Sequence, residues 1–235
     1  MTPLGESGIV VELDKQIELE THNKVQALAT HLEKEYVPAV MEYVPTFTSV
    51  TIYYDCIQAA NLMAIYGANS PFDVMKLILE ETIREIEIKN DHISEIVDIP
   101  VCYGGNHGPD LELVARHNNL SPKEVIDIHS AGTYLIYMIG FAPGFPYLGG
   151  LSKEIYAPRR ESPRIKIPAG SVGIAGNQTG IYPIETPGGW QLIGRTPLSL
   201  FNPNQKPPTL LKAGNRIRFN PITHHEYQEL VGGKR

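Results

Sequence analysis

The chain of 235 residues is long enough to form one large domain or two smaller ones, each with its own hydrophobic core. Its 42% hydrophobic and 20% charged residues are typical of a globular protein, and a net charge of −6 without a Lys/Arg-rich run argues against a nucleic-acid partner. The sequence contains no apolar stretch long enough to cross a bilayer and no signal-like start, so we expect a cytoplasmic protein with no membrane partner.

The first ninety residues alternate between strand and helix patterns. Residues 8–13 predict a β-branched strand, and residues 40–45 and 49–55 predict two more. Apolar residues three and four apart predict a helix through Val25, Leu28, Leu32 and Tyr36. Pro71 suits the first turn of a second helix, whose expected buried line is Phe72, Met75, Leu79, Ile83 and Ile86. This order predicts a small α/β domain with a split β-α-β layout.

The pattern changes near residue 92, so we expect two domains, residues 1–92 and 93–235. Residues 95–105 predict a strand that enters a glycine turn, and two short helices follow at residues 110–117 and 122–129. Ser121 can cap the second of these helices, and Glu124 can reach back to complete a capping box.

From Thr133 onward the sequence predicts only strands and turns. Short β-branched segments alternate with Gly, Pro and Asn, as in closed barrels and sandwiches. Residues 140–190 contain ten Gly and seven Pro, a density that raises disorder as an alternative. The β-branched residues between the turns favour ordered β structure. We therefore expect an α+β protein whose second domain has two short helices followed by a closed barrel or sandwich of β-strands.

Spacing alone identifies no catalytic motif and no metal site. The stretch Gly104–Gly108 lacks the Lys and Ser/Thr of a phosphate loop, and a turn is the simpler interpretation. The stretch Gly170–Gly176 has the glycine spacing of a dinucleotide loop but does not lead into a helix. Cys56 and Cys102 are isolated and lack metal-like spacing, so we expect buried free thiols in different domains.

Three histidines follow the short helices or lie near the C-terminus. His129 ends its helix and could stabilise that end through the helix dipole, or it could act as a general acid or base facing a site. His224 and His225 are expected to be solvated, in a strand-to-tail segment.

Three arginines are stronger candidates for chemistry. Arg159 and Arg164 are flanked by prolines that stiffen the backbone, and a guanidinium held in this way suits carboxylate or phosphate oxygens. The alternative is a pair of surface ion pairs with Glu154 or Glu161. Arg195 is the third candidate.

Two glycine-rich clusters complete the candidate residues. Gln178 and Thr179 offer an amide and a hydroxyl on a glycine-flanked turn. Gly188 and Gly189 precede the single tryptophan, Trp190, and allow close backbone approach. Trp190 can pack in the core or line a pocket with one face.

Several long motifs together resemble the KipI/PxpB family, also called allophanate hydrolase subunit 1. The motifs are "VCYGG", "SPKEVIDIHSAGTYLIYMIGFAPGFPYLGGLS", "PRRESPR" and "PAGSVGIAGNQTGIYPIETPGGWQLIGRTP". The resemblance covers nearly the whole chain, including "GESGIVVEL" and "VPTFTSVTIYYD" in the first domain. One departure is Glu6, where the family commonly has Asp, and it lies away from the candidate residues.

The resemblance implies an N-terminal α/β domain followed by a C-terminal cyclophilin-like β-barrel, similar to the carboxyltransferase part of urea carboxylase. It also implies the PxpB component of a heteromeric ATP-dependent 5-oxoprolinase, which cleaves 5-oxoproline to glutamate with a homologous PxpC/KipA-type subunit and a PxpA-type subunit. Such a component would be inactive alone, and its sequence does not locate the ATP site. The alternative that the resemblance implies is an inhibitor that binds the dimerisation and phosphotransfer domain of a sporulation sensor histidine kinase.

Within this family we expect catalytic roles for His129 and Arg195. The uncharged stretch 141–150 is expected to form a rigid apolar wall at the mouth of the site, because its prolines lower the entropy cost of order and its glycines permit close approach. The expected substrate-binding residues are Phe141, Pro143, Gly144, Phe145, Arg159, Arg164, Gln178, Thr179, Gly188, Gly189 and Trp190.

Overall fold

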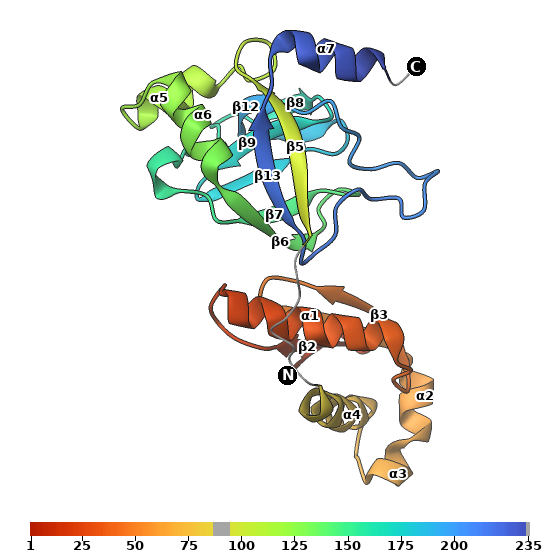
Figure 1. The fold of residues 1–235 in the computed structure, drawn as a ribbon. Coiled ribbons are helices and arrows are strands. Elements are labelled where there is room, and N and C mark those ends of the chain that lie inside the picture. The colour runs from red at the N-terminus through yellow and green to blue at the C-terminus, as the bar shows by residue number, and fades with distance from the viewer. Residues whose placement is uncertain (87–94, 234–235) are drawn as a thin grey trace. The chain divides into compact units, whose positions relative to one another are not determined.

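The computed structural model describes residues 1–86 and 95–233, and the chain divides into two compact units, Met1–Ile93 and Ser94–Arg235 (Figure 1). The expected domain boundary between residues 92 and 93 lies outside the described residues. Each unit has a hydrophobic core of its own. Among the described residues, no helix combines the length and the apolar character needed to cross a membrane.

The first unit is an antiparallel sheet of four strands in the order β1-β2-β4-β3, with helices on it. Its elements are β1 (Thr2–Leu4), β2 (Gly8–Glu12), α1 (Leu19–Lys34), β3 (Val40–Pro45), β4 (Ser49–Tyr54), α2 (Cys56–Asn61), α3 (Met63–Tyr66) and α4 (Pro71–Glu85). Because β4 runs antiparallel to both β2 and β3, those two strands are parallel to each other with β4 between them. The predicted split β-α-β layout is confirmed.

Alternation along β4 explains how the first core forms. Val50, Ile52 and Tyr54 point to one face and are buried, whereas Tyr53 on the opposite face is exposed. Helices α1 and α4 cover the buried face with apolar side chains at helical spacing. Of the residues of this second helix predicted to be buried, Met75 and Leu79 are buried, whereas Phe72, Ile83 and Ile86 are only half-buried. Val74 and Ile78 of α4 are buried although they were not predicted to be.

The short helices α2 and α3 were not predicted, although local signals mark both. The Asp55 side chain caps α2 by accepting hydrogen bonds from the N–H groups of Ile57 and Gln58. Gly67, with φ of 63°, ends α3 in the left-handed conformation. Cys56 lies at the start of α2 and is only half-buried, so the prediction of a buried thiol is wrong there.

The second unit contains a closed seven-stranded barrel in the order β10-β7-β6-β13-β5-β12-β9, and β9 pairs with β10 to close it. Its elements are β5 (Ile96–Tyr103), α5 (Leu111–His117), α6 (Pro122–Ala131), β6 (Thr133–Ile139), β7 (Pro146–Gly149), η1 (Lys153–Ile155), β8 (Arg164–Ile167), β9 (Ser171–Ala175), β10 (Gln178–Ile181), β11 (Thr186–Gly188), β12 (Gln191–Arg195), β13 (Arg216–Pro221) and α7 (His224–Gly232). The strands β8 and β11 form a separate two-stranded sheet. The predicted α+β fold with a C-terminal barrel is confirmed.

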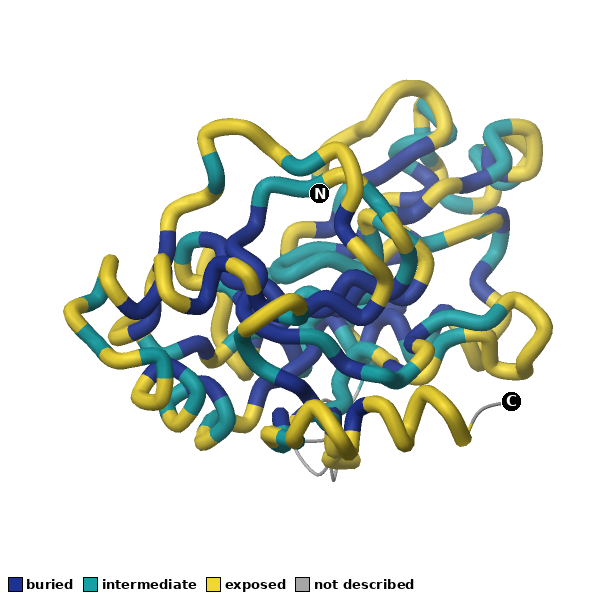
Figure 2. The backbone as a smooth tube through the Cα atoms, turned by 90° about the horizontal axis from the view of Figure 1, so that it is seen from above, coloured by how far each residue is buried: buried dark blue, intermediate teal, exposed yellow. Residues whose placement is uncertain are grey.

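Two apolar layers lie on opposite faces of strand β9, and all five residues of this strand are buried. Val172 and Ile174 point into the barrel core, whereas Ala175 joins a second cluster with Phe145, Tyr182 and Trp190. In Figure 2 the helix next to the C-terminus, α7, is mostly exposed, and within it Tyr227 is buried.

The C-terminal helix is the main departure from the strands and turns predicted from Thr133 onward. Residues His224–Gly232 form α7, so the expected strand-to-tail segment is wrong. The Thr223 hydroxyl accepts from the Glu226 N–H, and the Glu226 carboxylate accepts from the Thr223 N–H. This capping box favours a helix at a place where the hydrophobic pattern is weak. The capping box predicted for α6, between Ser121 and Glu124, is confirmed.

Candidate functional site

A pair of glycines makes room for two aromatic rings on the outer face of the barrel. Gly173 of β9 and Gly180 of β10 are cross-strand partners. A Cβ atom on Gly180 would lie 3.1 Å from the rings of both Phe145 and Trp190, and one on Gly173 would lie 3.2 Å from Trp190 Cβ. Without side chains at this pair, the two aromatic rings can lie directly against the strands. The polar and aromatic residues of the candidate site are arranged around this packing.

The loop between β6 and β7 explains the uncharged stretch of the sequence. Phe145 is buried, and its ring contacts the Tyr182 and Trp190 rings at centroid distances of 5.5 and 5.7 Å. Phe141 is 67% exposed at the tip of the loop, and its φ of 67° is unusual for a bulky residue. Gly144 has a φ of 82° and packs against the Phe201 side chain. The loop therefore has an exposed tip on a buried aromatic anchor, and it is not a uniform apolar wall.

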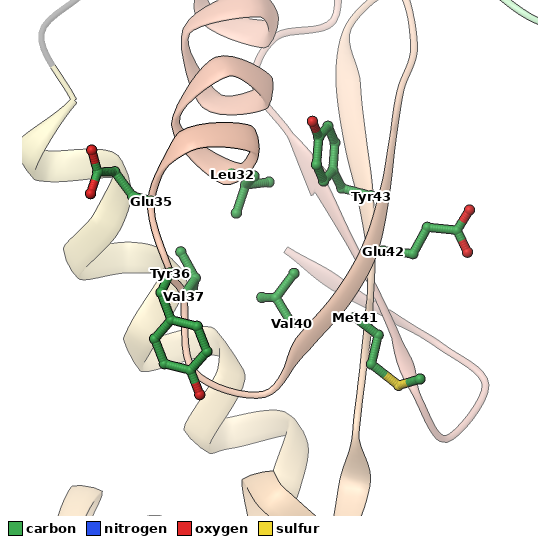
Figure 3. Close-up of a pocket in the computed structure, with 8 residues that line it drawn as sticks. All are labelled: Leu32, Glu35, Tyr36, Val37, Val40, Met41, Glu42 and Tyr43. Carbon is green, nitrogen blue, oxygen red and sulfur yellow. The ribbon is translucent and has the colours of Figure 1, made fainter.

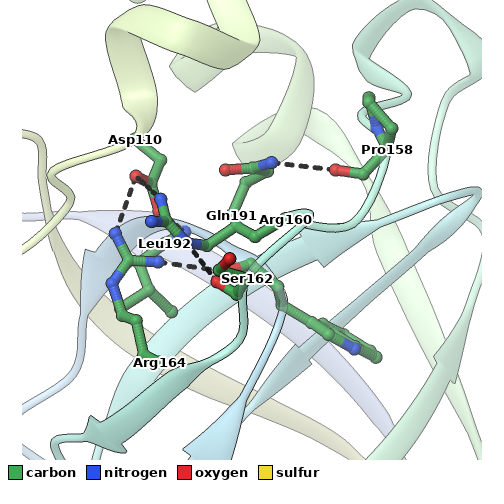
Figure 4. A network of polar contacts seen from close by, with 8 residues as sticks. Asp110, Pro158, Arg160, Ser162, Arg164, Gln191 and Leu192 are labelled. Carbon is green, nitrogen blue, oxygen red and sulfur yellow. Dashed lines mark hydrogen bonds and ion pairs between the residues drawn. The ribbon is translucent and has the colours of Figure 1, made fainter.

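A buried carboxylate organises the segment that contains Arg160 and Arg164 (Figure 4). The Oδ1 atom of Asp110 accepts from Arg164 Nη2 at 2.8 Å and from Arg160 Nη1 at 3.4 Å. Its Oδ2 atom accepts from the Leu192 N–H at 2.7 Å. The Asp110 side chain is 7% exposed, against 22% for Arg164 and 33% for Arg160. This network fixes residues 160–164 against β12.

The sequence did not identify Asp110 as a partner of these arginines. Its position before α5 is typical of an N-cap, yet its side chain makes no capping hydrogen bond and binds the arginines instead. The alternative of ion pairs to Glu154 or Glu161 is wrong for Arg164, because Asp110 lies 54 positions away in sequence but adjacent in space. A contact at this separation leaves no local signal.

Arg159 differs from its neighbours in having no ion pair with any residue in the described part of the chain. It is exposed and acts electrostatically on the Tyr182 hydroxyl. Burial raises the pKa of Tyr182 to about 12, although Arg159 and Arg164 oppose this shift. Gly188 lies against the same hydroxyl, where a Cβ atom would come 2.5 Å from the Tyr182 oxygen. Gly189 follows it, and its carbonyl accepts from the Arg160 N–H at 2.8 Å.

The candidate residues Phe141, Pro143, Arg159, Gln178 and Gly189 lie on the segments that carry or flank the aromatic cluster; we call them the arginine–aromatic surface. Each is at least partly exposed. Gln178 faces outward like Gly180, because residues two apart in a strand share a face. A guanidinium beside aromatic rings and an amide can bind a small anion or an amide-containing ligand.

Thr179 and His129 lie on the other side of the same strands, inside the unit. His129 is fully buried, and its ring nitrogens hydrogen-bond the Tyr103 hydroxyl at 2.7 Å and the Thr179 hydroxyl at 2.9 Å. Burial lowers the pKa of His129 to about 3, so the imidazole is neutral. The helix-dipole interpretation needs a charged ring and is therefore wrong. His129 and Thr179 do not meet the arginine–aromatic surface.

Arg195 is also separated from the arginine–aromatic surface. It ends β12, four residues after Gln191, which corresponds to about 13 Å along a strand. Its Nε donates to the Ala169 carbonyl at 2.8 Å, and its charge acts on His107. The structure thus divides the predicted site residues among three places, and only the arginine–aromatic surface gathers several of them.

The first unit has a pocket that the sequence did not indicate (Figure 3). It measures about 330 Å³ and lies where the end of α1 meets β3. Its lining residues are Leu32, Glu35, Tyr36, Val37, Val40, Met41, Glu42 and Tyr43. Tyr36 and Met41 are strongly exposed, so the pocket is shallow and partly apolar.

Comparisons with known proteins agree with the fold. Residues 1–211 match the model of the family described as carboxyltransferase domain, subdomain C and D. A 5-oxoprolinase subunit of Bacillus subtilis (strain 168) is 52% identical over 224 residues, which cover 95% of this chain and 93% of that protein. The crystal structure of PH0987 from Pyrococcus horikoshii is 40% identical with a TM-score of 0.56, covering 96% of this chain and 98% of that one.

A more distant structure supports the fold alone. The urea amidolyase of K. lactis is 19% identical with a TM-score of 0.76, and the match covers 96% of this chain and 15% of that one. The match over residues 1–211 and the 52% identity together show the family. The chain belongs to the carboxyltransferase-domain family, subdomain C and D, and within it to the KipI/PxpB group that its motifs resemble.

Proposed function

We propose that this chain is the PxpB component of a heteromeric, ATP-dependent 5-oxoprolinase that cleaves 5-oxoproline to glutamate. The observation that carries the proposal is the 52% identity to the 5-oxoprolinase subunit of Bacillus subtilis across almost the full length of both proteins. We further propose that the chain acts with a PxpC/KipA-type and a PxpA-type partner, in the cytoplasm, and is inactive alone.

The reaction explains why an exposed arginine beside an aromatic cluster is useful. Opening a five-membered lactam with water is thermodynamically difficult, and phosphorylation of the carbonyl oxygen by ATP would activate it. The substrate also carries a carboxylate. A guanidinium can bind such an anion through two parallel N–H donors.

We assign the carboxylate to Arg159 of the arginine–aromatic surface. Unlike Arg164, whose Nη2 lies 2.8 Å from Asp110, Arg159 has no ion pair among the described residues. The backbone of Phe141 supports a role for the adjacent loop tip, because a bulky residue at positive φ is costly and such residues cluster at functional sites. The catalytic roles of His129 and Arg195 remain predictions, since neither lies on this surface.

The test is 5-oxoproline-dependent ADP release by this chain mixed with its two partners, each omitted in turn. We expect release only with all three chains present. Arg159→Ala should lower kcat/KM by about tenfold to a hundredfold, as expected for the loss of a charged hydrogen bond. Arg159→Lys should restore only part of the activity, because it keeps the charge but loses the two-pronged geometry. Arg84→Ala, which removes an exposed arginine of the first unit, is the matched control.

The outcomes separate the two parts of the proposal. Full activity of Arg159→Ala in an assembled complex would overturn the assignment of the carboxylate and leave the assignment to the enzyme complex intact. No ADP release from a complex shown by gel filtration to be assembled would overturn the assignment to the enzyme. The kinase-inhibitor alternative from the sequence would then be tested by binding to the kinase domain.

A further inference from the structure

Three side chains that can bind a transition metal meet near the end of β5. Cys102 is in β5, His107 follows in the glycine turn, and His224 is the first residue of α7. Their potential ligand atoms all lie within 4.8 Å of one another. The sequence could not indicate this group, because His224 lies 117 positions from His107.

The distance between the two imidazoles fits a tetrahedral metal site. His107 Nε2 and His224 Nδ1 are 3.3 Å apart. Two nitrogens bound to one zinc ion at about 2.0–2.1 Å with tetrahedral angles are about 3.3–3.4 Å apart. A sulfur at about 2.3 Å would lie roughly 3.6 Å from each nitrogen. Since the Cys102 sulfur lies within 4.8 Å of both nitrogens, it would need to approach by at most about 1.2 Å. From this geometry we propose that Cys102, His107 and His224 form a zinc-binding site.

The ligand set selects zinc over harder cations. One thiolate and two imidazoles suit Zn²⁺, whereas Mg²⁺ and Ca²⁺ prefer oxygen ligands. On binding, a Zn–S bond forms and the Cys102 thiol proton leaves to solvent. Three protein ligands leave the fourth tetrahedral position for water or for a donor from a bound partner, as in open zinc sites.

The surroundings orient both imidazoles. The Tyr227 ring contacts the His107 ring at a centroid distance of 4.2 Å. The Gln228 side-chain amide lies 3.4 Å from His224 Nε2, the nitrogen that would not bind the metal. Hydrogen bonds to the second nitrogen fix the tautomer and direction of metal-binding histidines. Arg195 opposes the site, because its positive charge acts on His107, and a zinc-bound Cys102 thiolate would partly offset this repulsion.

The test measures zinc binding by the full chain, with no activity assay, so it does not depend on the proposed function. Metal-free protein is titrated with Zn²⁺ in competition with a chromogenic chelator and, separately, with Co²⁺. We expect one zinc per chain. The Co²⁺ form should show a thiolate-to-cobalt charge-transfer band and the intense visible bands of tetrahedral cobalt.

Variants identify the ligands. His224→Ala and Cys102→Ser should each weaken zinc binding by more than a hundredfold, since even outer-sphere changes cost about 10–100-fold. The matched controls are His225→Ala, which removes the neighbouring exposed imidazole, and Cys56→Ser, which removes the other thiol. His224 is exposed at a helix start, so its variant tests the site even if Cys102→Ser fails to fold.

Four results would overturn the proposal. The first three are the absence of zinc binding in competition with the chelator, equal zinc affinity of His224→Ala and the unmodified protein, and a Co²⁺ spectrum without a thiolate band. The proposal would also be overturned if His225→Ala lost as much zinc affinity as His224→Ala.

Discussion

The buried imidazole of His129 makes the stability of the barrel depend on pH. In the folded protein, burial lowers the pKa of His129 from its ordinary 6.5 to about 3. Between these two values the unfolded chain binds a proton at this position and the folded chain does not. The contribution of His129 to the free energy of unfolding is therefore fully present above about pH 6.5. As the pH falls through this window, the contribution is lost at about 1.4 kcal/mol per pH unit.

The variant His129→Gln isolates this contribution. Its amide can still hydrogen-bond the Tyr103 and Thr179 hydroxyls but does not titrate. Between pH 7 and pH 5 the free energy of unfolding should fall by about 2 kcal/mol more in the unmodified protein than in the variant, which is roughly thirtyfold in the folding constant. Urea unfolding followed by fluorescence is suitable, since the single tryptophan, Trp190, lies in the second unit.

The test depends on how the difference in unfolding free energy between the unmodified protein and His129→Gln changes with pH. The difference at neutral pH is not informative by itself, because the variant can also change stability there. His117→Gln, which removes an exposed imidazole of the same unit, is the matched control. A difference between the unmodified protein and His129→Gln that is the same at pH 7 and pH 5 would refute the neutral, buried imidazole.

Three further substitutions test the packing at Gly180, the ion pairs of Asp110 and the cap of α6. Gly180→Ala places a methyl group 3.1 Å from two aromatic rings and should cost about 1–3 kcal/mol by thermal unfolding, whereas Gly232→Ala, whose added methyl group meets nothing within 4 Å at the end of a helix, should not lower Tm; an undiminished Tm of Gly180→Ala would refute the tight packing. Asp110→Asn removes the buried partner of two arginines and should cost about 3 kcal/mol in urea unfolding, while Asp98→Asn breaks an exposed ion pair of the same 2.8 Å length with little effect. Ser121→Ala should lose about 1 kcal/mol through its helix cap, and an unchanged melting curve would contradict this.

Local signals in the sequence predicted much of the fold. The alternation of Val50, Ile52 and Tyr54 gave the correct buried face of β4, and the pair Ser121 and Glu124 gave the correct start of α6. The helix α7 could have been found in the same way, because Thr223 has Glu226 three positions later. This helix signal was overlooked because the residues from Thr133 onward otherwise follow a pattern of short strands and turns.

The candidate site was less predictable because it depends on long-range pairing. Strand register places Gly173 opposite Gly180, and neither glycine indicates that register by itself. Asp110 resembles an ordinary helix cap until the fold brings Arg164 beside it. The motifs identified a family and its important segments, but tertiary contacts decide which residues share one surface.

The parallel pairing of β5 with β13 has a consequence for folding. Partners such as Asp98 and Arg218 are 120 positions apart, whereas the sheet of the first unit is complete by residue 54. Because such distant pairing carries a large loop-closure cost, closure of the barrel should be the slow step of folding. A chain shortened before residue 216 is expected to keep its first unit folded and to expose Trp190 to solvent, which its fluorescence would report. Until β13 is synthesised, the edge of β5 is open to other chains, so aggregation of this protein should begin there.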